Sequence, residues 1–87
     1  MTFDVLVEVG LRPGIANPEG ATIERALPAL GFTQVWGVRT GKAIRFSIDA
    51  SDEAAARSQV GELCRRFLTN PVIEDFHVSL APAPVPA

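Results

Sequence analysis

Side chains that could carry out chemistry are scarce in this sequence. His77 is the only histidine and Cys64 the only cysteine among 87 residues. A lone histidine with no serine or cysteine that it evidently activates favours a solvated position over a catalytic one. Cys64 falls on the apolar stripe of a predicted helix, which is typical of a buried small hydrophobe and not of an exposed nucleophile. The sequence therefore predicts no catalytic site.

Metal and phosphate sites are also not indicated. One histidine and one cysteine cannot build a structural zinc site, and Glu74 and Asp75, as neighbours on a strand, point to opposite faces. The chain has no glycine-rich loop of the P-loop or dinucleotide type. Lys42, which follows Gly41, is more typical of a solvated turn than of a phosphate contact. We expect this chain to bind no cofactor or metal of its own.

Composition narrows the class of protein. A net charge of −2 and a pI near 5.2 argue against nucleic acid as a partner. No apolar run approaches the ~20 residues that cross a bilayer, and the N-terminus shows no signal peptide. The single cysteine favours a cytoplasmic location. A hydrophobic content of 47% in so short a chain indicates one small domain with a thin core, for which oligomerisation is a common remedy.

Hydrophobic periodicity sets the expected elements. Alternation predicts four strands, and spacing of three to four residues predicts two helices. In chain order, these are a strand at 3–10, a helix at 18–30, strands at 35–39 and 44–49 joined by a Thr40-Gly41 hairpin, a helix capped by Ser51 and ending near 69, and a strand at 75–80.

The helix ends carry recognisable signals. Asn17 precedes Pro18 and is expected to cap the first helix. Pro28 should bend or tighten its last turn, and Gly31 should end it in a left-handed conformation. The face of this helix expected to be buried comprises Ile23, Ala26, Leu27 and Leu30, and that of the second helix comprises Ala56, Val60, Leu63, Cys64 and Phe67.

The order βαββαβ predicts an α+β two-layer sandwich of the ferredoxin-like type. Its four-stranded antiparallel sheet would carry both helices on one face. The domain would occupy residues 1–80, and residues 81–87, rich in proline and alanine, would form a flexible tail. Leu6, Trp36 and Val38 would then lie on strands, and we expect the open sheet face to carry such residues into a partner.

Several stretches, taken together, resemble the PurS family, the small subunit of phosphoribosylformylglycinamidine (FGAM) synthase. The resemblance covers residues 2 to about 80, in order and with compatible spacing. The matching stretches are Val5-Leu6-Val7-Glu8-Val9, Arg12-Pro13-Gly14-Ile15, Asn17-Pro18-Glu19-Gly20, Ala26-Leu27, Leu30-Gly31-Phe32, Val35 through Lys42, Cys64 with Leu68, and Asn70-Pro71-Val72-Ile73-Glu74-Asp75-Phe76.

The resemblance implies a role in purine biosynthesis. The family's complex is an ATP-dependent ligase that converts formylglycinamide ribonucleotide and glutamine to formylglycinamidine ribonucleotide. It implies a non-catalytic homodimer, or a dimer of dimers, that bridges a large synthetase subunit (PurL) and a glutaminase subunit (PurQ) and supports ammonia transfer. ATP and magnesium would be bound by the large subunit.

Two motifs of the resemblance supply candidate site residues. Arg39, Thr40, Gly41 and Lys42 match the family's hairpin motif, and we expect this hairpin to contact a partner. Asn70, Pro71 and Glu74 match the segment that enters the last strand. There the end of a helix and the start of a strand already account for Asn70 and Pro71.

Two other classes remain open on the sequence. An ACT-like domain shares this topology, dimerises and binds a small metabolite. An acylphosphatase-like hydrolase would hold phosphate in a loop after the first strand. The stretch Leu11-Arg12-Pro13-Gly14 resembles such a loop only weakly. Saturable metabolite binding would indicate the first, and acyl-phosphate hydrolysis abolished by Arg12→Ala the second.

Overall fold

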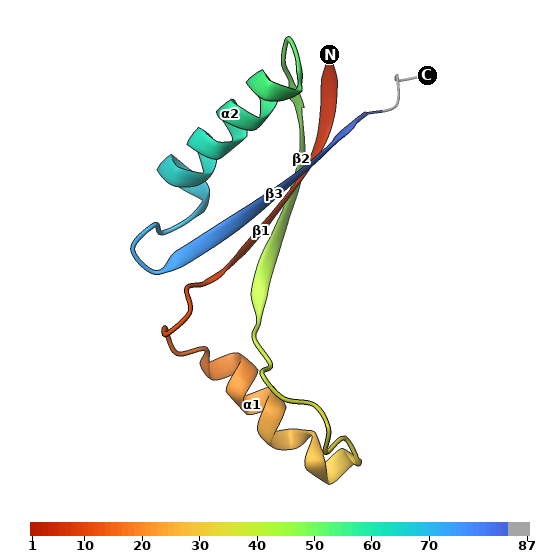
Figure 1. Cartoon of the computed structure of the whole chain (residues 1–87), viewed down its shortest axis with the longest axis vertical. Helices are drawn as coiled ribbons and strands as arrows, with labels where there is room; N and C mark the ends of the chain where they lie inside the picture. The colour runs from red at the N-terminus through yellow and green to blue at the C-terminus, as the bar shows by residue number, and fades with distance from the viewer. Residues whose placement is uncertain (84–87) are drawn as a thin grey trace.

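The protein is an elongated molecule built from a small sheet and a projecting helix (Figure 1). This computed structural model describes residues 1–83. The strands are β1 (Thr2–Leu11), β2 (Gly41–Asp49) and β3 (Glu74–Pro82), and the helices are α1 (Pro18–Ala26) and α2 (Glu53–Leu63). A short 3₁₀ helix, η1 (Pro28–Leu30), follows α1, and a π-helix, η2 (Cys64–Leu68), follows α2.

β1 is the central strand of the sheet. It pairs antiparallel with β2 on one side and β3 on the other, in the order β2-β1-β3. Val7 lies opposite Ile44 and Val78. The predicted alternation is confirmed, because every second residue from Phe3 to Val9 is buried, namely Phe3, Val5, Val7 and Val9.

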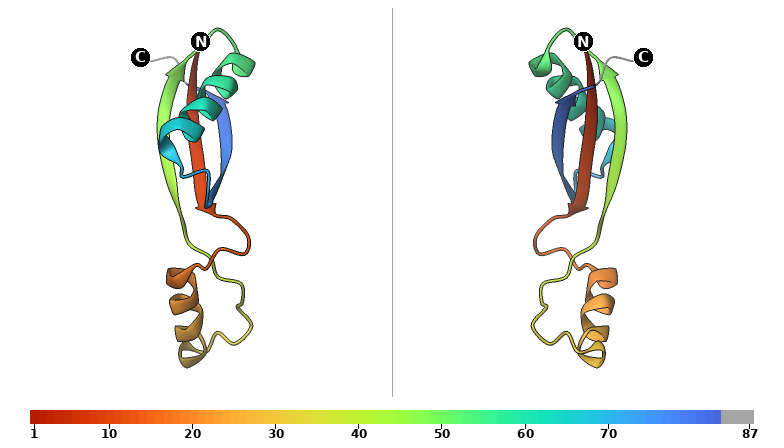
Figure 2. Two further views of the ribbon diagram at one scale, coloured as in Figure 1. Left: turned by 90° about the vertical axis from the view of Figure 1, so that its left-hand side faces the viewer. Right: turned by 90° about the vertical axis from the view of Figure 1, so that its right-hand side faces the viewer.

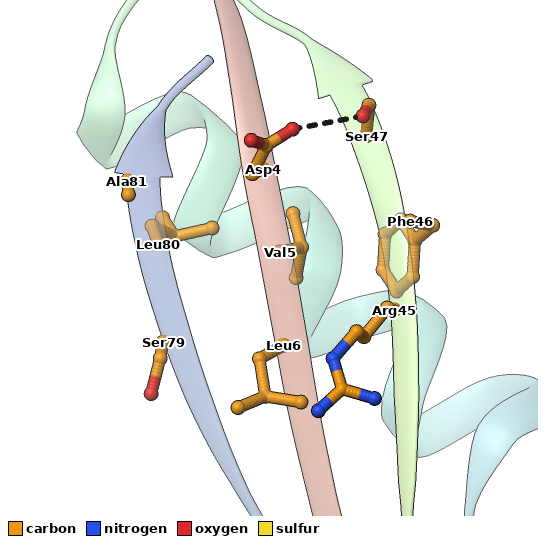
Figure 3. A pocket seen from close by; sticks show the side chains of 9 residues that line it. All are labelled: Asp4, Val5, Leu6, Arg45, Phe46, Ser47, Ser79, Leu80 and Ala81. Carbon is orange, nitrogen blue, oxygen red and sulfur yellow. Dashed lines mark hydrogen bonds between the residues drawn. The ribbon is translucent and has the colours of Figure 1, made fainter.

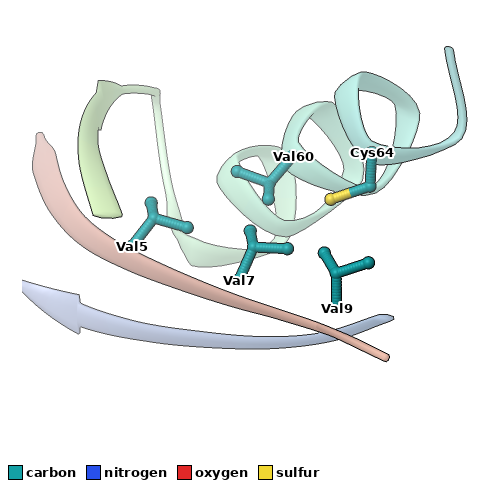
Figure 4. Packing of buried hydrophobic residues seen from close by; sticks show 5 residues of the cluster. All are labelled: Val5, Val7, Val9, Val60 and Cys64. Carbon is teal, nitrogen blue, oxygen red and sulfur yellow. The ribbon is translucent and has the colours of Figure 1, made fainter. Parts of the chain in front are cut away.

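α2 covers one face of this sheet and completes the core. Val60 and Cys64 point from α2 and η2 toward Val5, Val7 and Val9 (Figure 4). The N-cap is Asp52 and not Ser51, because the Asp52 backbone is extended and its carboxylate accepts a hydrogen bond from the Ala55 amide at 2.7 Å. The sheet and α2, with η2, form what we call the sheet layer.

The last turn of this helix departs from the predicted periodicity. The Thr69 amide donates to the Cys64 carbonyl, five residues back, at 2.9 Å, which marks a π turn. The wider turn shifts the residues that follow Cys64 around the helix. Leu68 packs against the core, whereas Phe67, expected in the buried stripe, is 80% exposed.

α1 does not cover the sheet. It lies beyond the end of the strands, on an extension that we call the arm, residues 18–37 (Figures 1 and 2). As expected, Asn17 caps α1, and after Pro28 the chain tightens into η1 before Gly31, at φ 93°, ends it. The only buried residue of α1 is Gly20. The expectation of two helices on one face of the sheet is therefore wrong, since α2 alone packs there.

The predicted strand at 35–39 is also absent, so the described sheet has three strands and not four. This segment returns along α1, where the Val38 amide donates to the Glu24 carboxylate at 2.8 Å. It therefore cannot fold back on β2, and Thr40-Gly41 is not a hairpin. The remaining order β2-β1-β3 is that of a ferredoxin-like sheet without one edge strand.

The first residues of the predicted flexible tail, 81 and 82, belong to β3. Ala81 and Pro82 end β3, and the Ala83 amide donates to the Thr2 carbonyl at 2.9 Å. Proline is accepted here because β3 is an edge strand, where the lost amide donor need not face a neighbour. The rest of the predicted tail, residues 84–87, lies outside the described residues.

Candidate functional site

The arm joins the sheet layer through two chain crossings that we call the neck, residues 11–17 and 38–41. Arg39 bridges the two crossings. Its Nη2 group donates to three backbone carbonyl oxygens, those of Leu11, Arg12 and Ile15, at 3.2 to 3.3 Å. Hydrogen bonds from a charged donor are stronger than neutral ones, so Arg39 holds the outgoing loop against the returning segment.

Asn17 is the second bridge of the neck. Its Nδ2 donates to the Thr40 carbonyl at 2.9 Å, and its Oδ1 accepts from the Gly20 amide at 2.8 Å and the Thr40 hydroxyl at 3.0 Å. One side chain therefore caps α1 and fixes the returning segment. At Gly20 an added Cβ would lie 2.3 Å from the Val38 carbonyl oxygen, so only glycine allows this approach.

Gly41 and Lys42 lie where the neck enters β2. A Cβ at Gly41 would lie 2.4 Å from the Val9 carbonyl oxygen, which explains glycine at this close strand contact. Lys42 is exposed and helps to line a cavity of about 190 Å³ at the junction, together with Glu19 and Glu74. Within residues 1–83, its ammonium makes no ion pair or hydrogen bond.

The motif that enters β3 forms a compact turn. The Asn70 amide donates to the Glu74 carboxylate at 2.7 Å, and the Asn70 side chain accepts from the Val72 amide at 3.1 Å. Arg12 fastens this turn to the neck, since its side chain donates to the Pro71 carbonyl and pairs with Asp75 at 3.4 Å. Asn70 and Glu74 thus shape the turn, and Arg12 is engaged in protein contacts.

The arm carries apolar side chains that the described chain does not cover. Leu30 is 69% exposed, Phe32 50% and Trp36 84%. Ile23 and Val35 are exposed as well. We expected Trp36 on an open sheet face, but the structure places it on the arm, away from β1 and β2. Sequence reasoning missed the arm, although the abundance of apolar residues between 23 and 36 in so small a protein was the signal for it.

The open face of the sheet is shallow and carries both apolar and polar side chains. A groove of about 520 Å³ crosses it, with Leu6 in the middle strand and Arg45 beside it (Figure 3). At one end the Ser47 hydroxyl donates to the Asp4 carboxylate at 3.1 Å. Of the residues expected to reach a partner from this face, Leu6 alone lies here.

The structure gives Cys64 and His77 no catalytic surroundings. Cys64 is fully buried, and burial raises the pKa of its thiol above the ordinary value of 9.0, against a lowering by Arg65. His77 is exposed on β3, with its Nδ1 3.9 Å from the Glu8 carboxylate.

Among residues 1–83 no three acidic, histidine or cysteine side chains gather as a metal site. In the same range, none of the helices has the length and apolar character needed to cross a membrane.

Comparison with known proteins identifies the family to which this chain belongs. A family model described as PurS, phosphoribosylformylglycinamidine (FGAM) synthase, matches residues 4–82. The phosphoribosylformylglycinamidine synthase subunit PurS of Methanothermobacter thermautotrophicus is 44% identical over 80 residues, which cover 92% of this chain and 94% of that protein. The corresponding subunit of Methanocaldococcus jannaschii is 38% identical over 78 residues, covering 90% and 94%.

Solved structures share the fold as well as the sequence. The crystal structure of Methanocaldococcus jannaschii PurS, one of the subunits of formylglycinamide ribonucleotide amidotransferase in the purine biosynthetic pathway, has a TM-score of 0.83 at 38% identity, covering 94% of this chain and 99% of that one. A chain of PurLQS from Thermotoga maritima has a TM-score of 0.85 at 31% identity, covering 93% and 99%. The chain belongs to the PurS family, whose members are subunits of FGAM synthase in purine biosynthesis.

Proposed function

We propose that this chain is a non-catalytic adaptor that bridges a PurL-like synthetase and a PurQ-like glutaminase and supports the transfer of ammonia from glutamine. The observation that carries the proposal is the arm. It exposes apolar side chains and is held to the sheet layer by the hydrogen bonds of the neck. An arrangement of this kind suits assembly, because a partner that covers these apolar side chains removes them from water and so stabilises the complex. The likeness to a chain of Thermotoga maritima PurLQS supports the choice of partners.

A second copy of the chain is the proposed cover for the arm. α1 has nine residues, and isolated helices shorter than ~12–15 residues are marginal in water. The apolar side chains of the arm, Ile23 of α1 and Leu30 of η1 among them, find no cover in the described chain. Two arms exchanged about a two-fold axis would cover each other's apolar faces in a closed dimer. Two-fold symmetry is the commonest symmetry of soluble oligomers.

Lys42 is the proposed point of contact with a larger subunit at the neck. Arg39 and Thr40 are already hydrogen-bonded within the neck, whereas the Lys42 ammonium is exposed and makes no such bond within residues 1–83. A partner carboxylate there would form a charge-assisted bond. Lys42→Glu should weaken assembly while Lys42→Arg should preserve it, and equal affinity of both variants would contradict this contact.

The remaining chemistry of the complex is assigned to the partners. ATP and magnesium would be held by the PurL-like subunit, and glutamine by the PurQ-like subunit. We place the assembly in the cytoplasm, where a reduced Cys64 inside the core is stable.

Reconstitution tests the adaptor proposal directly. The chain is mixed with the large and glutaminase subunits from the same organism, and FGAM formation is measured with glutamine and, separately, with free ammonia. The expected result is that glutamine-dependent synthesis requires the chain, whereas ammonia partly bypasses it. If neither rate responds to the chain, the adaptor proposal is overturned, and metabolite binding to the isolated oligomer becomes the next measurement.

The homodimer is tested by analytical ultracentrifugation of the isolated chain. Dimers are expected for the unsubstituted protein, and Trp36→Ser together with Phe32→Ser should shift the population toward monomer. Ser79→Ala, on the opposite part of the molecule, is the matched control and should leave the dimer intact. A monomeric unsubstituted chain would contradict the homodimer and leave the adaptor role to be judged by the reconstitution.

A further inference from the structure

The two outer edges of the sheet differ in what contacts them. β2 and β3 are both edge strands, because the sheet order is β2-β1-β3. β3 ends with Pro82, which has no amide to donate, and Arg57 of α2 donates to the Val78 carbonyl of β3 at 3.3 Å. β2 contains no proline, and the side chains of residues 1–83 make no hydrogen bond to its backbone. The outer edge of β2 is therefore the edge that can accept another strand.

Part of the sheet face under α2 also remains uncovered. Val60 and Cys64 pack on the buried valines of β1 (Figure 4), and α2 lies closer to β3 than to β2. The apolar side chains of β2 on this face, Ile44, Phe46 and Ile48, are only partly buried. A second helix on the β2 side of α2 would remove them from water.

The arm holds a helix and an extended segment that already lie together. The Val38 amide donates to the Glu24 carboxylate of α1 at 2.8 Å, which holds the returning segment against the helix. The backbone groups of residues 33–37 make no hydrogen bond within residues 1–83. Gly37, at φ 70°, separates residues 33–36 from the neck. A helix and a neighbouring edge strand are the elements that this sheet lacks relative to a ferredoxin-like fold.

We propose that the arm of a second copy completes the sheet layer. Residues 33–36 of that copy pair with the outer edge of β2, and its α1 covers the apolar side chains of β2 beside α2. α1 has nine residues and is about 14 Å long, whereas β2, also of nine residues, spans about 30 Å, so the helix fits along the strand. The chain's own arm does not reach this place, because the neck holds it beyond the ends of the strands (Figures 1 and 2).

The charges of the two surfaces support this pairing. β2 carries a net charge of +1, since it has two cationic residues and one aspartate, and the arm carries −1, since it has two glutamates and one arginine. Surfaces of opposite charge favour the contact of an arm with β2. Exchange about a two-fold axis forms this contact twice and leaves neither arm uncovered. The inference rests on the proposed homodimer and specifies that the partner's sheet layer covers each arm.

Hydrogen exchange above and below the dissociation constant of the dimer tests the proposal. Analytical ultracentrifugation first gives that constant. At a concentration about 100 times higher, the β2 amides that point away from β1 should exchange about tenfold more slowly than in the dilute monomer. The outer amides of β3 are the matched control and should exchange equally fast at both concentrations.

The outcomes of this experiment separate the inference from the homodimer. A dimer that protects amides of the arm but not those of β2 would leave the homodimer standing and overturn the inference. A chain that stays monomeric at every concentration overturns both. Slower exchange at β2 together with unchanged exchange at β3 is the result that supports the completed sheet.

Two substitutions on either side of Val7 give a second test. Ile44 and Val78 lie opposite Val7 on β2 and β3, and both are partly buried. Ile44→Ala should raise the dissociation constant of the dimer by about tenfold or more, because the lost apolar contact occurs twice. Val78→Ala is the matched control and should leave this constant unchanged. Equal weakening by both variants would trace the effect to the stability of the sheet layer and overturn the inference, as would an unchanged constant for Ile44→Ala.

Discussion

The sheet layer and the arm are held together by different forces. Every buried apolar side chain of the described residues lies in the sheet layer, from Phe3 on β1 to Cys64 after α2. The arm buries no large side chain and is fixed at its neck by the side chains of Asn17 and Arg39. Apolar burial is the dominant favourable contribution to folding, whereas a hydrogen bond contributes only about 1 kcal/mol net. We therefore expect the sheet layer to be the more stable region and the arm to gain stability when its apolar side chains are covered.

The largest effect should come from the centre of the sheet layer. Val7→Ala removes two methyl groups from a side chain that is 0% exposed, so the free energy of unfolding should fall by about 2–3 kcal/mol. Leu6→Ala, on the other face of β1, is the control and should cost less because Leu6 is only half-buried. Urea denaturation followed by circular dichroism measures both. A smaller loss for Val7→Ala than for Leu6→Ala would show that the core lies elsewhere.

A change in the neck should affect the arm and leave the sheet layer intact. Gly20→Ala places a Cβ 2.3 Å from the Val38 carbonyl oxygen, and relieving this clash should cost the arm about 1–3 kcal/mol of local stability. Hydrogen exchange should then speed up at the Val38 amide while exchange in β1 is unchanged. Gly10→Ala is the control, since an added Cβ there meets nothing within 4 Å. Faster exchange throughout β1 would show that arm and sheet fold as one unit.

Asn17 allows the two functions of one side chain to be separated. Asn17→Ala should cost about 1–2 kcal/mol of arm stability, because α1 loses its cap and Thr40 loses its partner. Asn17→Asp keeps an oxygen for the Gly20 amide but has no donor for the Thr40 carbonyl. In Asn17→Asp, hydrogen exchange should therefore be faster than in the unsubstituted chain at the Gly41 amide, within the neck, and nearly unchanged in α1. Equal behaviour of the two variants would contradict the dual role.

The sequence predicted the sheet layer better than the arm, for a physical reason. Alternation in β1 and spacing in α2 report burial against neighbours within the same chain, so Val5, Val60 and Cys64 were assigned correctly. Val35, Trp36 and Val38 alternate in the same way, but a strand also needs a partner edge, and the chain turns this segment toward α1. Apolar residues that only another molecule would cover give the same alternating sequence pattern as residues of a core.

The candidate site shows a similar division. The sequence predicts that residues 39–42 form a hairpin, whereas the structure makes them a chain crossing in which Arg39 donates to three carbonyl groups. These carbonyl groups belong to residues 24 to 28 positions away and leave no local pattern in the sequence. Phe67 was misplaced because helical periodicity assumes one constant turn. A π turn is set by how Leu68 fits the core, which only the packed structure reveals.

The smallest predicted effect is a pH response confined to the sheet layer. Burial raises the pKa of the Cys64 thiol in the folded chain above its ordinary value of 9.0, because the thiolate is poorly solvated there. The unfolded chain releases this proton first as pH rises, so the contribution is fully present below pH 9.0 and is lost as pH rises toward the folded-state pKa. The loss is at most about 1.4 kcal/mol per pH unit between the two pKa values.

Cys64→Ala isolates this response, since alanine has no proton to release and the other titrating groups are unchanged. Urea titrations between pH 7 and pH 10 should show a shallower fall of stability for Cys64→Ala than for the unsubstituted chain. Hydrogen-exchange opening energies within α1, on the arm, should show no such difference between the two proteins, because Cys64 packs on β1 and not on the arm. If the arm lost stability in step with the sheet layer, the two regions would share one cooperative unit, and the arm would not need a second copy to explain its stability.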